Sequence, residues 1–192
     1  SHSEDFQNKV IELNLRNSLF IDNTASDLIP DTYSYYLNNG IGIITCNKIA
    51  NSGSYSNYHS LKVLSRDNNS PFLYETNVGA ALPVISTLNN LINSGDKIVK
   101  IEAVLSGTLN YIFNSFNEVD TFHEIVSKAV DLGYTEPDPK IDLCGIDVSR
   151  KILILARESG YKLEIDDIKK NHFLPEDSIK AESKDDFLLS LK

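Results

Sequence analysis

The first third of the chain alternates short β-branched segments with helical segments, and this order restricts the folds open to it. Strands are predicted at residues 18–22 (SLFID), 41–46 (IGIITC) and 71–76 (PFLYET), and helices at residues 30–39 and 55–66. Pro30 near the first turn and Gly40 after the last turn support the first helix. Strands that alternate with helices produce a parallel sheet with right-handed crossovers. The sequence therefore predicts half of a doubly wound α/β domain.

Helical patterns dominate the rest of the chain. The segment LPVISTLNNLINSG has apolar residues at helical spacing before Gly95, and Thr121 with Glu124 has the spacing of a capping box. The predicted helices are residues 82–95, 106–116, 121–133 and 146–160. Between the first two, residues 97–107 (KIVKIEAVLSG) are predicted to form a strand, although their apolar positions alternate only in part.

Charge and composition exclude several classes of partner. The 192 residues carry 27 acidic and 18 basic side chains, and the formal net charge of −9 disfavours a nucleic-acid partner. The apolar runs are far shorter than the roughly 18 residues of a membrane-spanning helix, and no signal-peptide pattern opens the chain. We therefore expect a cytoplasmic protein without a membrane partner. Cys46 and Cys144 lack CxxC spacing and are expected to be reduced thiols.

The segment GYTEPDPKIDLCGIDVSRK, residues 133–151, concentrates charged side chains ahead of the apolar run ILILA. Asp147 and Lys151 are four residues apart on the predicted helix and can pair. One interpretation is an ordinary surface ion pair; the other makes Lys151 a proton donor at the boundary between the core and a polar loop. Pro137 and Pro139 stiffen the loop, so Glu136 could bind a cationic group of a substrate.

Two further positions have a functional and a structural interpretation. Lys48 follows an apolar strand, where ligands bind in open α/β sheets, and Thr24 follows the preceding strand; a solvated surface lysine is the alternative. In ETNVGAALP, Glu75 and nearby carbonyls could hold a hard cation, and Gly79 lets the backbone approach closely. The alternative for this segment is a tightly packed turn before a helix.

Five segments together resemble homoserine dehydrogenase, in the form that is fused behind an aspartate kinase in bifunctional enzymes. They are DNTAS, TCNKIA, YETNVGAALPVI, LSGTLNYIF and GYTEPDPKIDLCGIDVSRKILILARESG, in the family's order. The resemblance implies reduction of L-aspartate 4-semialdehyde to L-homoserine with NADPH or NADH. It also implies a partial Rossmann-type domain over residues 1–77, and an α+β substrate-binding and dimerisation domain over residues 78–192 with a sheet covered by helices.

The resemblance also implies roles for individual residues. Lys151 would donate the proton, and Glu136 would bind the substrate amino group beside Asp142 and Asp147. Lys48 would lie between cofactor and substrate, and Thr24 would contact the nicotinamide cofactor. The cation site would hold a monovalent ion such as sodium, and its residues would be Glu75, Val78, Ala80 and Leu82. The family's dimerising lobe would include residues 97–107, so a homodimer is expected.

Two departures from the family pattern bear on these expectations. Ala81 replaces a glycine of the family's VGAGLP motif, and a positive φ there would cost roughly 1 kcal/mol. No G-x-G-x-x-G occurs, so the chain is expected to be a fragment that binds dinucleotide poorly, and its preference between NADP and NAD stays open. Two alternatives remain: a two-domain dehydrogenase acting on another small aldehyde or hydroxy acid, and a non-catalytic dimerising module.

Overall fold

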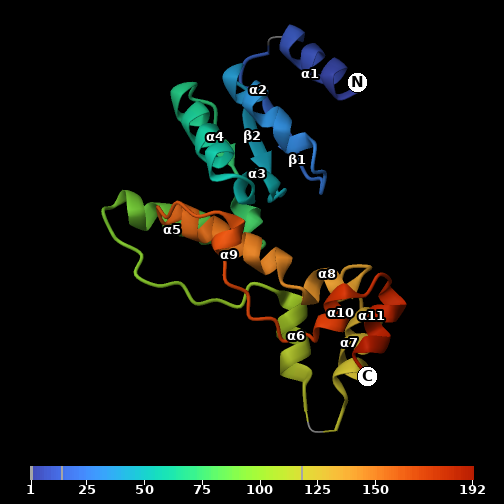
Figure 1. Ribbon diagram of the computed structural model, residues 1–192. Helices are drawn as coiled ribbons and strands as arrows, with labels where there is room; N and C mark the ends of the chain where they lie inside the picture. The colour runs from blue at the N-terminus through green and yellow to red at the C-terminus, as the bar shows by residue number, and fades with distance from the viewer. Residues whose placement is uncertain (1, 14, 118) are drawn as a thin grey trace. The chain divides into compact units, whose positions relative to one another are not determined.

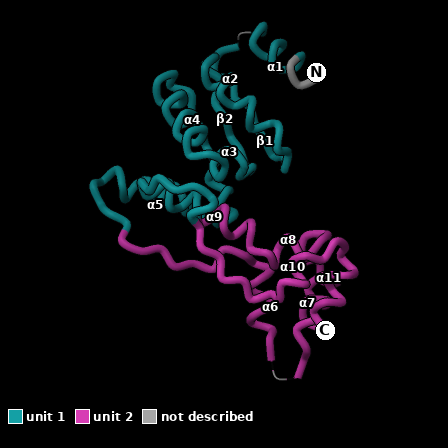
Figure 2. The backbone as a smooth tube through the Cα atoms, viewed as in Figure 1, with its two compact units in different colours: residues 1–98, 153–167 teal, residues 99–152, 168–192 magenta. Residues whose placement is uncertain are grey.

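The computed structural model describes residues 2–13, 15–117 and 119–192 and divides the chain into two compact units (Figure 2). Unit 1 comprises residues 1–98 and 153–167, and unit 2 comprises residues 99–152 and 168–192. Each unit has its own buried core.

Unit 1 contains a three-stranded parallel sheet (Figure 1). Strands β1 (Leu19–Asp22), β2 (Gly42–Thr45) and β3 (Phe72–Leu73) pair in sequence order, as the alternating pattern predicted. β3 is shorter than predicted because the chain leaves the extended conformation at Tyr74 (φ −148°, ψ 35°) and enters the 3-10 helix η2 (Glu75–Asn77). The predicted α/β class is confirmed for this part of the chain.

The two faces of this sheet differ in burial. One in-register row consists of Phe20, Ile43 and Phe72. This row packs toward helix α2 (Tyr33–Asn38), where the ring of Phe20 stacks on that of Tyr36 with centroids 4.3 Å apart. The opposite row consists of Ile21, Ile44 and Leu73. Ile21 and Leu73 are 57% and 52% exposed, so the described residues cover this row less than parallel strands are normally covered on each face.

Unit 1 contains helices at the predicted positions and also short helices that were not predicted. The predicted helix at residues 30–39 divides into η1 (Ile29–Thr32), which contains Pro30, and α2. The remaining helices of the unit are α1 (His2–Leu13), α3 (Ile49–Ser52), α4 (Tyr55–Asp67), α5 (Val84–Asn93) and η3 (Ile165–Asp167). Helices α1 and α3 were not predicted; α3 has only four residues, too few to show a helical period.

The turn before α5 requires glycine at residue 79. Gly79 has φ +85°, and a Cβ placed there would lie 2.6 Å from Cγ2 of Val84. Ala80 also adopts a positive φ, of 53°, whereas Ala81 is not among the residues with positive φ. The replacement of the family's glycine by Ala81 therefore carries no left-handed strain, and the strained alanine of this turn is Ala80.

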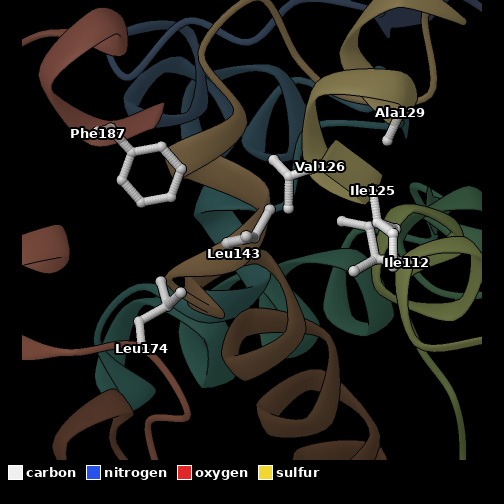
Figure 3. Close-up of a cluster of buried hydrophobic side chains, with 7 residues drawn as sticks. All are labelled: Ile112, Ile125, Val126, Ala129, Leu143, Leu174 and Phe187. Carbon is white, nitrogen blue, oxygen red and sulfur yellow. The ribbon is translucent and has the colours of Figure 1, made fainter. Parts of the chain in front are cut away.

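Unit 2 is helical. Its elements are α6 (Gly107–Ser115), α7 (Phe122–Asp131), α8 (Pro139–Leu143), α10 (Glu176–Lys180) and α11 (Lys184–Ser190). The division between the units falls within α9 (Ile146–Glu158). The core of unit 2 gathers side chains from four of these helices and from the segment before α10 (Figure 3). It consists of Ile112, Ile125, Val126, Ala129, Leu143, Leu174 and Phe187.

Local signals predicted two of these helices well. Ser106 caps α6, and the capping box of Thr121 and Glu124 at α7 is confirmed in both directions. Helix α8 was missed because its five residues lie within what the sequence suggested was a loop; Asp138 caps it and Pro139 occupies its first turn.

The predicted strand at residues 97–107 is wrong. Residues 97–106 form neither helix nor strand, and the three strands of the described chain do not pair with them. Val99 and Val104 are 93% and 74% exposed. A β-branched segment forms a strand only where another strand supplies hydrogen-bond partners, and the described parts of unit 2 contain no strand.

Among residues 2–13, 15–117 and 119–192, no helix combines the length and the apolar character needed to cross a bilayer.

Candidate functional site

A buried hydrogen-bond network closes the carboxyl ends of β1 and β2 in unit 1. Asp22 is 1% exposed, and its Oδ2 accepts hydrogen bonds from the Tyr33 hydroxyl (2.5 Å) and from Asn47 Nδ2 (3.3 Å). Its Oδ1 accepts from the backbone N–H of Thr24 at 2.8 Å. The Tyr33 hydroxyl also lies 2.8 Å from Thr45 Oγ1. One carboxylate thus fixes the loops that follow two neighbouring strands.

The electrostatics of the network favour an ionised Asp22. Burial would raise the pKa of Asp22, but the hydrogen bonds from Tyr33, Thr24 and Asn47 outweigh it, and the net pKa lies below its ordinary value. Burial and the adjacent carboxylate raise the pKa of Tyr33 well above its usual range. The pair therefore holds a carboxylate and a neutral phenol near pH 7.

The two predicted cofactor residues of unit 1 both lie beside this network. Thr24 is exposed, and its Oγ1 accepts from the backbone N–H of Ser26 at 3.1 Å. Lys48 directly follows Asn47, is half-buried, and forms the N-cap of α3. The structure therefore brings the segments of Thr24 and Lys48 to the same edge of the sheet, where open α/β sheets bind ligands.

Glu75 has a structural function in the predicted cation segment. Its two carboxylate oxygens accept hydrogen bonds from the backbone N–H groups of Ile85 (2.8 Å) and Ser86 (2.9 Å), in the first turn of α5. The N–H groups in the first turn of a helix have no partners within the helix. A negative charge such as the Glu75 carboxylate also stabilises the N-terminal end of the helix. The tightly packed turn that the sequence offered as an alternative is thus present. Val78 is fully buried, and Leu82 is 65% exposed.

The ammonium of Lys151 is held at the N-terminal end of α6 in unit 2. Its Nζ lies 2.6 Å from Asp147 Oδ2 and 2.7 Å from the carbonyl oxygen of Leu105. The predicted pairing of Asp147 with Lys151 is confirmed. The Lys151 side chain is 18% exposed, against 42% for Asp147, so the ammonium is the more enclosed partner.

Asp142 organises the loop at the same end of α6. Its Oδ2 accepts from the backbone N–H of Glu136 at 2.8 Å, and its Oδ1 lies 3.0 Å from the hydroxyl of Thr108. That hydroxyl is also 2.6 Å from the carbonyl oxygen of Tyr134, so one proton serves two acceptors. Glu136 is exposed, and the contacts of Asp142 fix its backbone rather than its carboxylate.

The arrangement in unit 2 can bind and protonate an anionic oxygen. Lys151 has three N–H donors, and its contacts with Asp147 and Leu105 use two of them. The carboxylates of the neighbouring loop suit a cationic group. Among the described residues, no group of three or more His, Cys, Asp or Glu side chains has the arrangement of a metal site.

Several residues of these networks were not predicted. Asp22 ends an apolar strand, and an acidic residue in that position was the available signal. Thr108 gave no local signal, because its partners Tyr134 and Asp142 lie 26 and 34 residues away in the sequence.

Comparisons with known proteins agree with one another. The family model of homoserine dehydrogenase matches residues 83–189. A chloroplastic bifunctional aspartokinase/homoserine dehydrogenase of Zea mays is 45% identical over 175 residues, which are 91% of this chain and 19% of the maize protein. This chain therefore spans about a fifth of the length of that relative.

Two solved structures share the fold. A Candida auris protein of unknown function has a TM-score of 0.90 and 34% identity, covering 98% of this chain and 54% of that one. A hyperthermophilic archaeal homoserine dehydrogenase in complex with NADPH has a TM-score of 0.65 and 32% identity, covering 73% of this chain and 43% of that one.

Proposed function

This chain belongs to the homoserine dehydrogenase family, and from that premise we propose that the complete polypeptide reduces L-aspartate 4-semialdehyde to L-homoserine with NADPH or NADH. The observation that supports this activity best is the enclosed Lys151 ammonium between Asp147 and the Leu105 carbonyl, beside the loop that carries Glu136. The test is oxidation of NADPH by the complete polypeptide when L-aspartate 4-semialdehyde is the substrate.

Lys151 is the proposed proton donor. As the aldehyde is reduced, negative charge develops on its oxygen, and an ammonium within hydrogen-bond distance stabilises that oxygen and then protonates it. Asp147 holds the ammonium in place through its 2.6 Å contact. The bound reduced nicotinamide supplies the hydride for this reaction.

Glu136 is the proposed partner of the substrate amino group. The substrate carries an ammonium next to a carboxylate, and an exposed carboxylate on a loop fixed by Asp142 can meet that ammonium. Asp142 is proposed to act by positioning this loop, because its two oxygens accept hydrogen bonds from the Glu136 N–H and the Thr108 hydroxyl.

Thr24 and Lys48 are the proposed cofactor residues. The donor chemistry at this edge of the sheet, a hydroxyl and an ammonium on loops fixed by Asp22 and Asn47, fits a nicotinamide cofactor. The NADPH complex of the archaeal neighbour supports the same class of cofactor. We propose that residues 1–77 belong to the nucleotide-binding part and residues 78–192 to the part that binds substrate.

We extend the proposal to a monovalent cation, such as sodium, held by Glu75 and the backbone of Val78, Ala80 and Leu82. The segment offers only oxygen ligands, which is the chemistry that hard cations require. The Glu75 carboxylate retains lone pairs after its contacts with Ile85 and Ser86. Replacement of sodium by choline in the assay should lower activity, and an unchanged rate would contradict the cation site.

We also propose a homodimer. Residues 97–106 form neither helix nor strand and expose Val99 and Val104, which a second copy can cover. Analytical ultracentrifugation of the chain should show a dimer at micromolar concentration. A monomer at the highest soluble concentration would contradict this proposal for the chain alone.

A further inference from the structure

The backbone of Lys48 is fixed from both sides. Before it, the Asn47 side chain donates to the Ser26 carbonyl (2.8 Å) and accepts from the backbone N–H of Ile49 (3.0 Å). After it, the Lys48 carbonyl oxygen accepts from the N–H groups of Asn51 (3.1 Å) and Ser52 (2.9 Å) and from the Ser52 hydroxyl (2.8 Å). The position of the Lys48 backbone after β2 therefore depends on the position of α3.

Helix α3 cannot hold its own C-terminal end. It has four residues, so its last carbonyl groups have no continuing helical turn to bind them. Arg157 supplies the missing donors: its Nη1 donates to the carbonyl of Asn51 (2.8 Å), and its Nη2 donates to the carbonyl of Gly53 (2.8 Å). A cation at the C-terminal end of a helix also interacts favourably with the helix dipole.

Arg157 is itself rigidly held. Its side chain is fully buried, and its Nε and Nη2 donate to the carbonyl of Leu163 at 3.0 and 2.9 Å. Glu164 Oε2 accepts from Nη2 at 3.1 Å, and the rings of Tyr55 and Tyr58 lie 5.7 and 5.4 Å from the guanidinium carbon. Burial lowers the pKa of Arg157 from its usual value, and the carboxylate and the rings oppose that change.

We propose that Arg157 is a positioning residue for Lys48: its guanidinium fixes the C-terminal end of α3, and α3 fixes the lysine beside the carboxyl edge of the sheet. The functional part of this inference rests on the proposed role of Lys48 between cofactor and substrate. A lysine at position 157 would keep the positive charge. Its single ammonium group could not bind the carbonyls of Asn51, Gly53 and Leu163 at once, as the planar guanidinium group of arginine does. The alternative is an arginine that only stabilises the core.

The first test needs only the chain. Hydrogen–deuterium exchange of residues 49–53 should accelerate roughly tenfold or more in Arg157→Lys, since α3 loses its terminal partners. Arg66→Lys is the matched control, because Arg66 is 75% exposed on α4. If Arg157→Lys does not fold, Ser52→Ala removes one bond to the Lys48 carbonyl and should accelerate exchange at the same residues, with the exposed Ser60→Ala as its control. Unchanged exchange in a folded variant would overturn the proposal.

The second test uses the complete polypeptide. If Arg157 acts through Lys48, Arg157→Lys should lower kcat/KM by roughly tenfold or more, and should add little when Lys48 is already alanine. The kcat/KM of Ser52→Ala is likewise measured with Lys48 present and with Lys48 replaced by alanine. Effects that simply multiply in the double variant would mean an independent structural role and would overturn the proposal. If the wild-type polypeptide lacks the dehydrogenase activity, the proposed function fails, and the exchange result alone decides whether Arg157 fixes the Lys48 segment.

Discussion

Lys151→Ala in the complete polypeptide should lower kcat for L-aspartate 4-semialdehyde by roughly 10²–10⁴-fold, the usual contribution of a positioned general acid. The substitution removes an ammonium held between Asp147 and the Leu105 carbonyl, and in the proposed reaction it would leave the aldehyde oxygen without its donor. Steady-state kinetics measure this effect, and fluorescence titration with NADPH should show little change in cofactor affinity.

A matched control separates catalysis from folding. Lys128→Ala changes an exposed lysine on α7 and should leave kcat within about twofold, as surface substitutions do. Lys151→Ala also leaves the Leu105 carbonyl without its donor, so thermal unfolding is measured for both variants. A folded Lys151→Ala protein with nearly normal turnover would remove Lys151 from the mechanism.

Glu136→Gln should raise the KM for L-aspartate 4-semialdehyde by about 30-fold or more. An ion pair that is desolvated in a complex loses roughly 2–5 kcal/mol when one partner is removed, and about 1.4 kcal/mol corresponds to a factor of ten. Glutamine preserves the shape of the side chain and the bond from the Glu136 N–H to Asp142, so the change isolates the carboxylate charge. The KM for NADPH should change little.

Asp138→Asn is the matched control for this loop. Asp138 caps α8 by accepting from the Lys140 N–H at 3.0 Å, and asparagine caps helices about as well as aspartate. The KM should therefore change by less than about threefold. Equal effects of the two substitutions would indicate that this acidic segment acts through its total charge, and that Glu136 makes no specific contact with the substrate.

Sequence patterns predicted the elements that carry strong periodic or capping signals. The extended segments of the three strands, the capping box of α7 and the pairing of Asp147 with Lys151 are each encoded by residues close together in the sequence. The strand predicted at residues 97–107 is wrong because strand formation also depends on residues that are distant in the sequence. Its composition favours a strand, but a strand also needs a partner, and the described residues supply none.

The networks around the candidate sites were only partly predictable. Lys48 and Thr24 could be placed because strand ends in a parallel sheet meet at one edge. The contacts of Arg157 with Asn51 and Gly53 join residues more than 100 positions apart, and no local pattern encodes them. Glu75 shows a further limit, because the sequence offered both a cation ligand and a helix turn, and the observed contacts with α5 establish only the second.

Two alternative functions of the chain predict different results in an assay of NADPH oxidation with L-aspartate 4-semialdehyde. A dehydrogenase for another small aldehyde or hydroxy acid would use the same Lys151 but another substrate, and a dimerising module without activity would use neither. Both retain the sheet and helices described above, so the fold does not distinguish them.

The decisive measurement is the rate of NADPH oxidation by the complete polypeptide with L-aspartate 4-semialdehyde, followed at the same time by mass spectrometry of the product. The proposed function predicts substrate-dependent oxidation that yields L-homoserine in equal amount and is nearly abolished in Lys151→Ala. Turnover of a different aldehyde, or the absence of any NADPH oxidation by the folded polypeptide, would contradict it.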